Sequence, residues 1–192
     1  MEPHTQKMKP ILFSTPMVQA ILEDRKTMTR RIMNDQPNEK LFPCGTGCQY
    51  WANDPNDLKA KYYKAKYEIG DILWVRETWR KNNGMPTGYP FEYRATAEAD
   101  GVPIDEPWKP SIFMPREAAR IFLKVTRVRV ERLQDISGED AMKEGVKVES
   151  MFPLCIGDSY RAFSILWESI NGKESWDANP WVWVYEFERV EL

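Results

Sequence analysis

The chain has 192 residues, a net charge of −2, three cysteines and a single histidine, His4. This length suits one domain that buries its own core without disulfides. One histidine near the N-terminus argues against histidine-dependent catalysis, so acid–base work must fall to Lys, Glu, Asp, Tyr or Cys. Cys44 and Cys48 lack the second pair of ligands that a tetrahedral zinc site requires. We therefore expect no metal and no cofactor.

The charged and aromatic residues fit a protein that binds nucleic acid, and they also fit an ordinary surface and a β-rich core. Residues 1–133 contain 22 Lys and Arg against 17 Asp and Glu, whereas residues 134–192 contain 5 against 12. This asymmetry allows a basic face that binds nucleic acid, and ordinary surface charge explains it equally well. Eight Trp, eight Tyr and eight Phe fit a β-rich core and also supply surfaces on which bases can stack.

Segment composition predicts one domain with two insertions. Residues 1–8 are expected to be a disordered leader, and residues 9–192 a single domain. Residues 34–66 and 80–110 are polar and rich in turn residues, which is typical of long loops. Such loops often shape a ligand site, and we expect both to line or cover one. The chain has no apolar run of the roughly 20 residues that span a membrane and no signal-peptide core, so we expect a cytoplasmic location without membrane contact.

The most chemically dense stretch is ILEDRKTMTRR at residues 21–31. A short strand at 10–13 and a helix from Thr15 to about Asp24 are predicted before it, with proline in the first helical turn. A β-favouring stretch, 27–33, follows.

This order places Lys26 on a turn between helix and strand. Thr29 and Arg31 then share one face of the strand, because side chains alternate along a strand. Lys26 and Thr29 are therefore expected to converge on one pocket.

The middle of the chain contains predicted strands at 72–79 and 91–96. Between them and the next strand, residues 108–116 combine Trp108, Ser111 and Arg116 in an extended segment with two prolines. This composition is typical of a loop that stacks on bases or grips a ligand, and it also fits a packed surface loop.

The longest β pattern runs from Arg120 to Leu133. Its apolar residues change parity at Thr126 and Arg127, which predicts a bulge or bend. The arginines of this strand face either phosphates or solvent.

Two helices and a strand complete the prediction. Ser137 caps a short helix that Gly145 ends, and this places Glu144 at the helix C-terminus. An amphipathic helix follows from Asp158 to about Asn171. The last strand, 181–190, has aromatic residues on one face that should be core. The fold class is therefore α+β, a small mixed β-barrel of about five or six strands with three short helices and two long loop insertions.

Four sequence blocks resemble the ASCH superfamily, a β-barrel relative of the PUA domain, in its phage and prophage versions. The blocks are ILEDRKTMTRR, GDILWVRETW, LKVTRVRVERLQDISGEDAMKEGV and WVWVYEFERV, in this order along the chain. The family typically has glycine where this chain has Asp24, which tolerates a left-handed turn. The resemblance implies the host cytoplasm as the location if the protein is encoded by a phage.

Within this superfamily, the bacterial N(4)-acetylcytidine amidohydrolases are similar around the lysine and threonine. The resemblance implies a catalytic trio of Lys26, Thr29 and Glu144, although Glu139 or Asp140 satisfies the third position after a small shift of the alignment. The residues expected to bind substrate are Arg25, Arg31, Arg76, Trp108, Ser111 and Arg116.

This trio suits amide hydrolysis without a metal. Neighbouring arginines and burial can lower the pKa of Lys26, so that it takes a proton from Thr29 or from water. Glu144 then serves the leaving exocyclic amine, and Arg31 pairs with a phosphate or with the tetrahedral oxyanion. The expected ligand is a nucleoside or a single-stranded nucleic acid.

Two other functions remain open. The same cleft can bind RNA, DNA or a modified base without catalysis, with Trp108 or Trp79 stacking on the base, and ASCH relatives are also thought to include nucleases. Alternatively, the chain is a phage structural or accessory protein that has kept the fold alone.

Overall fold

The computed structural model describes residues 8–38, 41–44, 49–52, 61–82, 90–100, 107–148 and 156–192. Of the expected leader, residues 1–7 lie outside these ranges, whereas Met8 already belongs to the first strand. Within the described ranges, no helix has both the length and the apolar character needed to cross a membrane.

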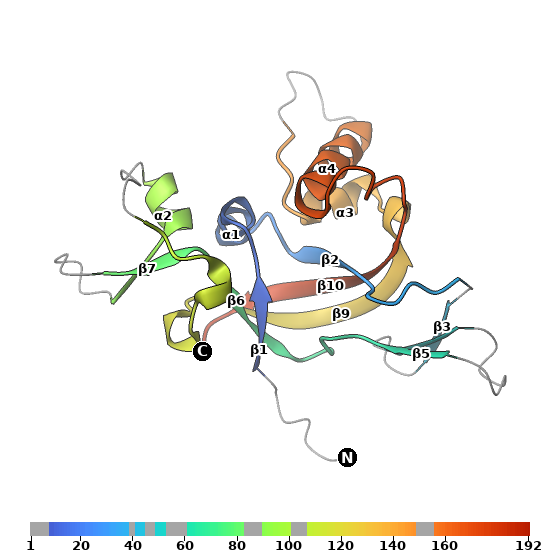
Figure 1. Cartoon of the computed structure of the whole chain (residues 1–192), viewed down its shortest axis with the longest axis horizontal. Helices are drawn as coiled ribbons and strands as arrows, with labels where there is room; N and C mark the ends of the chain where they lie inside the picture. The colour runs from blue at the N-terminus through green and yellow to red at the C-terminus, as the bar shows by residue number, and fades with distance from the viewer. Residues whose placement is uncertain are drawn as a thin grey trace, which may run out of the picture.

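A five-stranded sheet with the order β1-β6-β9-β10-β2 forms the centre of the molecule. The strands are β1 Met8–Leu12, β6 Ile72–Arg76, β9 Phe122–Arg132, β10 Trp181–Val190 and β2 Met28–Ile32. β1 runs parallel to β6, and the other neighbouring pairs are antiparallel. The two longest strands, β9 and β10, lie side by side along its middle (Figure 1).

The predicted bulge in β9 is confirmed by the pairing of β9 with β10. Arg127 faces Glu186, but the next residue of β10, Phe187, faces Val125, so Thr126 has no partner. Both Thr126 and Arg127 are exposed, whereas Val125 and Val128 are buried. The extra residue therefore keeps the apolar side chains of both halves of the strand on the core side.

The three predicted helices are present as α1 Thr15–Leu22, α3 Gly138–Lys143 and α4 Ile156–Asn171. Asp24 follows α1 with a φ of 56°, the left-handed conformation expected of it. The Ser137 hydroxyl accepts a hydrogen bond from the Asp140 N–H at 3.1 Å and so caps α3.

The sheet packs on both faces. Trp183, Tyr185 and Phe187 of β10 belong to the main core, as predicted, and Trp181 packs against its edge. The alternate residues of β10 point to the opposite face, where a second core forms beneath α3 and α4. Figure 1 shows these two helices together over one end of the sheet. The sheet thus separates two cores.

The strand predicted at 72–79 is wrong in its second half. β6 ends at Arg76, and a separate strand, β7 Trp79–Lys81, follows. Between them Glu77 turns inward, where both of its carboxylate oxygens accept hydrogen bonds from Arg120 at 2.9 Å. This buried ion pair redirects the chain.

The strand predicted at 91–96 is also shorter than expected. β8 Phe91–Tyr93 pairs with β7, and the chain then forms an unpredicted helix, α2 Arg94–Ala99. An ion pair between Arg94 and Glu98, one helical turn apart at 2.6 Å, supports this helix.

Residues 34–66, predicted as a loop, contain a second sheet. Its strands are β3 Leu41–Cys44, β4 Gln49–Ala52 and β5 Lys61–Lys64, all antiparallel. Residues 39–40, 45–48 and 53–60 of this insertion lie outside the described ranges. In Figure 1 this sheet lies at the end of the central sheet opposite α2 and β7.

The α+β class is confirmed, but the described strands do not close into a barrel. The edges of the central sheet are β1 and β2, and no ladder joins them in the described part of the chain. One side chain links them, because the Arg31 guanidinium of β2 donates to the Leu12 carbonyl of β1 at 2.7 Å. The sheet is therefore open, with its edges near each other at one place.

Candidate functional site

The turn between α1 and β2 is fastened to the end of α3. The N–H groups of Arg25 and Lys26 both donate to the Ala20 carbonyl, at 2.9 and 3.0 Å, which closes the turn after α1. The Thr27 N–H donates to the Lys143 carbonyl at 2.9 Å, and Lys26 forms a single β-bridge with Glu144. Two segments more than a hundred residues apart thus become neighbours.

Gly145 allows this close approach. It has a φ of 87°, and a Cβ placed on it would lie 2.8 Å from the Ala20 Cβ and 2.9 Å from the Lys26 Cβ. Both the backbone conformation and the lack of space therefore require glycine here. The predicted helix end thus also determines how closely α3 packs against the turn.

Lys26 and Glu144 form a buried ion pair. They are 2% and 3% exposed, and the Lys26 Nζ lies 2.7 Å from the Glu144 Oε2. The same ammonium donates to the backbone carbonyls of Met28 and Glu144, both at 2.8 Å. Its three N–H donors are therefore all satisfied by protein acceptors.

Burial lowers the pKa of Lys26, and the charges of Arg31 and Arg30 lower it further, while Glu144 raises it. The direction agrees with the prediction from the sequence, but burial is the larger cause. Lys26 can therefore release its proton more easily than an exposed lysine.

Arg30 holds the other oxygen of Glu144. Its guanidinium lies 3.1 Å from the Glu144 Oε1 and also pairs with Glu131 at 2.6 Å and with Asp140 at 3.2 Å. Arg30 was not among the site residues predicted from the sequence. The strand alternation that put Thr29 and Arg31 on one face did indicate that Arg30 points to the other, where α3 lies.

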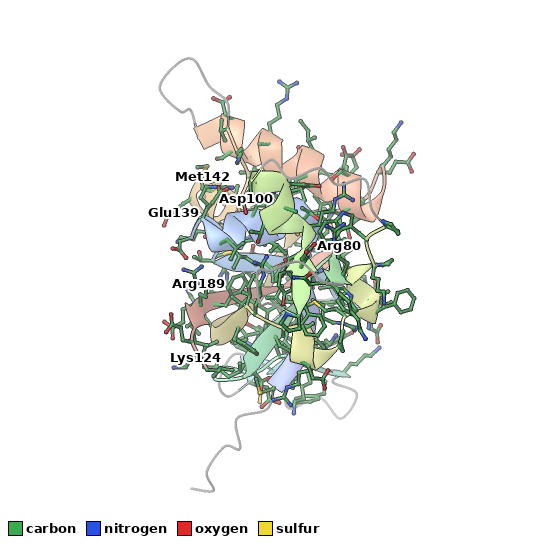
Figure 2. All side chains as sticks on the ribbon, turned by 90° about the vertical axis from the view of Figure 1, so that its left-hand side faces the viewer. Arg80, Asp100, Lys124, Glu139, Met142 and Arg189 are labelled. Carbon is green, nitrogen blue, oxygen red and sulfur yellow. The ribbon has the colours of Figure 1, made fainter. Side chains whose placement is uncertain are left out.

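Among the three candidates for the third catalytic position, Glu144 is the one that contacts Lys26. Glu139 is exposed and pairs with Lys143 at 2.8 Å. Figure 2 shows Glu139 at the edge of the molecule beside Met142, pointing away from the core. Asp140 pairs with Arg30 and Arg129.

Thr29 and Glu144 line the same small cavity, of about 90 Å³, between β2 and α4. Lys26 is not among its lining residues, so Lys26 and Thr29 do not converge on this cavity as expected. Thr29 is 3% exposed, and its hydroxyl has no hydrogen-bond partner among the described residues. The other walls include Arg30, Arg31 and the aromatic residues Phe163 and Trp167. Glu144 has both carboxylate oxygens held by Lys26 and Arg30, and the volume of the cavity suits a few water molecules or a small acyl group.

A larger cavity, of about 580 Å³, lies beside the first, and both are lined by Arg31 and Ile32. Aromatic residues supply much of its wall: Tyr62, Tyr63, Tyr67, Trp183 and Tyr185. Lys66 and Lys64 add positive charge, although Lys64 pairs with Glu68 at 2.8 Å, and Asp35 adds a negative charge. Described residues of 34–66 therefore line this cavity, whereas none of the described residues of 80–110, which were expected to line or cover the same cleft, lines either cavity.

Sequence reasoning did not identify these aromatic side chains as cavity residues. Trp183 and Tyr185 were predicted as core, and they are buried, but the core they belong to borders this space. The tyrosines of β5 lay in a segment predicted as a loop. Only the pairing of distant strands brings the two groups together.

Arg31 lies where the two cavities meet. Its guanidinium donates to the Leu12 carbonyl and stacks 5.3 Å from the centre of the Phe13 ring. No carboxylate of the described residues lies within ion-pair distance of Arg31, and burial lowers the pKa of its guanidinium.

The remaining predicted site residues lie elsewhere. Arg25 donates to the Gly145 carbonyl at 2.8 Å, and it lines an apolar groove between α1 and α4. The other four, Arg76, Trp108, Ser111 and Arg116, line neither of the two cavities that contain Arg31. The prediction that they share one site with Lys26 has no support in these contacts.

Trp79 is buried in a small third core, so its ring offers no face for base stacking, contrary to the prediction. Trp108 is partly buried, and the Arg80 guanidinium lies 4.5 Å from its ring centre.

Among the described residues, no three His, Cys, Asp or Glu side chains gather in a way that could hold a metal ion. Cys44 is a free thiol, and Cys48 lies outside the described ranges.

Comparison of the chain with protein-family models, with curated proteins and with solved structures found no match.

Proposed function

We propose that this protein is an ASCH-like amidohydrolase that removes the acyl group from N(4)-acylated cytosine bases. The observation that carries the proposal is the small cavity, which is lined both by Thr29, whose hydroxyl has no partner among the described residues, and by Glu144. Behind that carboxylate, Lys26 supplies an ammonium at 2.7 Å. A hydroxyl, a carboxylate and a lysine are the groups that amide hydrolysis needs when histidine and metal are lacking.

The two neighbouring cavities suit the two parts of such a substrate. The acyl group enters the small cavity, and the base lies in the larger one, against the tyrosines of β5 and the aromatic residues of β10. Aromatic rings stack on any base, and the surrounding cations attract phosphate. Arg31, which lines both spaces, is then next to the scissile amide.

In the proposed reaction, the Thr29 hydroxyl or a water held by it attacks the acyl carbon. The Glu144 carboxylate receives the proton of the attacking group, with Lys26 fixing its orientation and sharing the charge. Arg31 stabilises the oxyanion. The C–N bond then breaks, the proton passes to the exocyclic amine, and cytidine and a carboxylic acid are released. If Thr29 is the attacking group, the acyl group is transferred to its oxygen as cytidine leaves. Water then hydrolyses this ester and releases the carboxylic acid.

The test is deacylation of N(4)-acetylcytidine by the wild-type protein and by Thr29→Val. Valine keeps the volume of threonine, and no internal hydrogen bond is lost, so the fold should be unchanged. We expect kcat/KM to fall by about 10²-fold or more, as for other losses of a group that transfers a proton or attacks.

The control is Thr126→Val, which changes the exposed bulge threonine and should leave the rate unaltered. The proposal fails if the wild-type protein releases no acetate, or if Thr29→Val is as active as the wild type.

One observation favours a second function, binding of a modified base without turnover. All three N–H donors of Lys26 are occupied, which is also how a purely structural ion pair is built. Titration calorimetry that detects binding of N(4)-acetylcytidine together with the absence of deacylation would select this alternative.

A further inference from the structure

An aromatic ring is exposed on the surface, in the segment that precedes β9. Phe113 and its neighbour Ile112 belong to the short 3-10 helix η1 Ser111–Phe113 and are 70% and 58% exposed. Phe113 is the most exposed aromatic residue among the described side chains. The next residue, Met114, is buried against Trp79 in the third core. The backbone that presents Phe113 is therefore firmly anchored.

Three cations belong to the same region. The Arg76 guanidinium donates to the Ile112 carbonyl. The Lys109 ammonium lies 5.2 Å from the centre of the buried Trp79 ring. Arg116, three residues after Phe113, is exposed and reaches the Met8 sulfur at 2.6 Å. We call Arg76, Lys109, Ile112, Phe113 and Arg116 the η1 surface.

The cations of the η1 surface have no carboxylate partners among the described residues. Two nearby carboxylates are occupied, since Glu77 pairs with Arg120 and Glu92 with Arg80. Glu117, next to Arg116, forms no ion pair with any of the three cations. Lys109 and Arg116 are exposed and can contact a ligand directly, whereas Arg76 is half-buried with its guanidinium 5.5 Å from the centre of the Trp74 ring.

Cations elsewhere on the protein surface are often neutralised. Figure 2 looks at the end of the molecule that carries α2 and β7, with Arg80 labelled there and with Lys124 and Arg189 on the other side of the view. Lys124 pairs with Glu188 at 3.7 Å, and Arg189 with Asp24 at 3.5 Å. The η1 surface differs from those positions in retaining its charge.

Two of the three cations are located by their neighbours in β1. Arg76 is aligned with Leu12, at one end of β1, and Arg116 contacts Met8, at the other. A strand of this length spans about 13 Å. Phe113 lies in the segment that connects the two ends.

From this arrangement we infer that the η1 surface binds single-stranded nucleic acid. A base stacks on the exposed Phe113 ring, and successive phosphates contact the separated cations. An apolar protein partner would instead bury three cations without partners, which is costly. None of the five residues lines the cavities at Arg31, so this is a second site, and it extends beyond the proposed hydrolysis.

The experiment measures fluorescence anisotropy of a labelled oligouridine of about 12 nucleotides between about 50 mM and about 200 mM salt. With three phosphate contacts, the slope of log K against log salt should be about −2. Phe113→Ala should weaken binding about 10-fold or more. The double variant Lys109→Gln and Arg116→Gln should bring the slope to about −0.7.

Matched controls lie on the far side of the molecule. Arg161 and Lys173 are exposed, have no carboxylate partner among the described residues, and should leave the slope unaltered when both are changed to Gln. Ile165→Ala removes an apolar side chain that is 59% exposed and should likewise have no effect.

The inference is overturned if the oligouridine does not bind at low salt, or if the η1 variants bind it as the wild type does. It is also overturned if phosphatidylserine vesicles bind in a Phe113-dependent way and the oligouridine does not, since the surface would then contact membranes. The readout is binding alone, so the result is independent of whether the cavity hydrolyses an amide.

Discussion

At the scale of single residues, the hydrogen bonds of the buried Lys26 ammonium determine how the site is built. Lys26 donates two hydrogen bonds to Glu144, the residue that follows α3, and one to the Met28 carbonyl. Without Lys26 the Glu144 carboxylate would keep Arg30 as its partner on one oxygen only. A buried carboxylate that loses a partner is destabilising. Lys26 is therefore a folding determinant, whatever its role in chemistry.

We expect Lys26→Met to lower the free energy of unfolding by about 3 kcal/mol, because methionine fills the space but leaves three acceptors without a donor. Urea denaturation measures this change. Lys124→Met, at an exposed and weak ion pair, should cost less than about 1 kcal/mol. Equal losses of unfolding free energy for the two substitutions would show that the buried ion pair stabilises the protein no more than the exposed one.

Sequence reasoning could predict part of this residue arrangement. The cap at Ser137 and the glycine at 145 placed Glu144 at a helix end, and the resemblance to a family paired it with Lys26. Local sequence patterns do not, however, show which distant segments come into contact. Arg30 was missed for this reason, and Arg76, Trp108, Ser111 and Arg116 were assigned to a cleft that they do not line.

At the scale of elements, the contact between α3 and the turn after α1 depends on one glycine. Gly145→Ala should destabilise the protein by about 2 to 4 kcal/mol, from the left-handed backbone and from overlap with Ala20 and Lys26. Gly172→Ala has the same backbone penalty, with a φ of 94°, but open space around it, and should cost about 1 to 2 kcal/mol. Thermal and urea unfolding compare the two. A cost for Gly145→Ala no larger than that for Gly172→Ala would contradict the close approach.

Elements with strong periodicity were predictable, and those made of polar residues were not. The bulge at Thr126 was visible because apolar residues change parity there, and α4 because its apolar residues recur at helical spacing. The sheet of β3, β4 and β5 was hidden in a segment rich in turn residues, and its strands are only four residues long. α2 was missed because the ladder between β7 and β8 ends at Tyr93, and this end depends on where β7 lies and not on the local sequence.

At the scale of the whole molecule, Arg120 connects the unit of α2, β7 and β8 to the central sheet. It pairs with Glu77, which follows β6, donates to the Thr96 hydroxyl of α2 at 2.6 Å and lies over the Tyr93 ring of β8. Burial raises the pKa of Glu77 above its ordinary value of 4.5, although Arg120 opposes the shift. The folded protein therefore binds a proton where the unfolded chain has released it. The resulting stability is present at low pH and is lost as the pH rises through the folded-state pKa.

Wild-type protein should accordingly lose more unfolding free energy than Glu77→Gln between about pH 4 and about pH 7. Urea denaturation at several pH values gives the two slopes. Glu188→Gln, at an exposed position, should keep the wild-type slope. Identical slopes for wild type and Glu77→Gln would mean that this carboxyl titrates alike in the folded and unfolded chains.

Whole-molecule architecture was predictable only as a class. Alternating strands and three helices indicated α+β, but whether a sheet closes depends on the relative position of its first and last strands, which no local pattern reports. Here β1 and β2 stay apart, and one arginine side chain spans the distance between them.

The contacts of Arg31 affect which ligands can bind between β1 and β2. Since Arg31 is held by a carbonyl and a phenyl ring, no internal counter-ion has to be displaced before a visiting anion can bind it. Simple oxyanions such as sulfate will compete with any phosphate- or carboxylate-bearing ligand at this point, and the choice of buffer will govern the affinities that are measured.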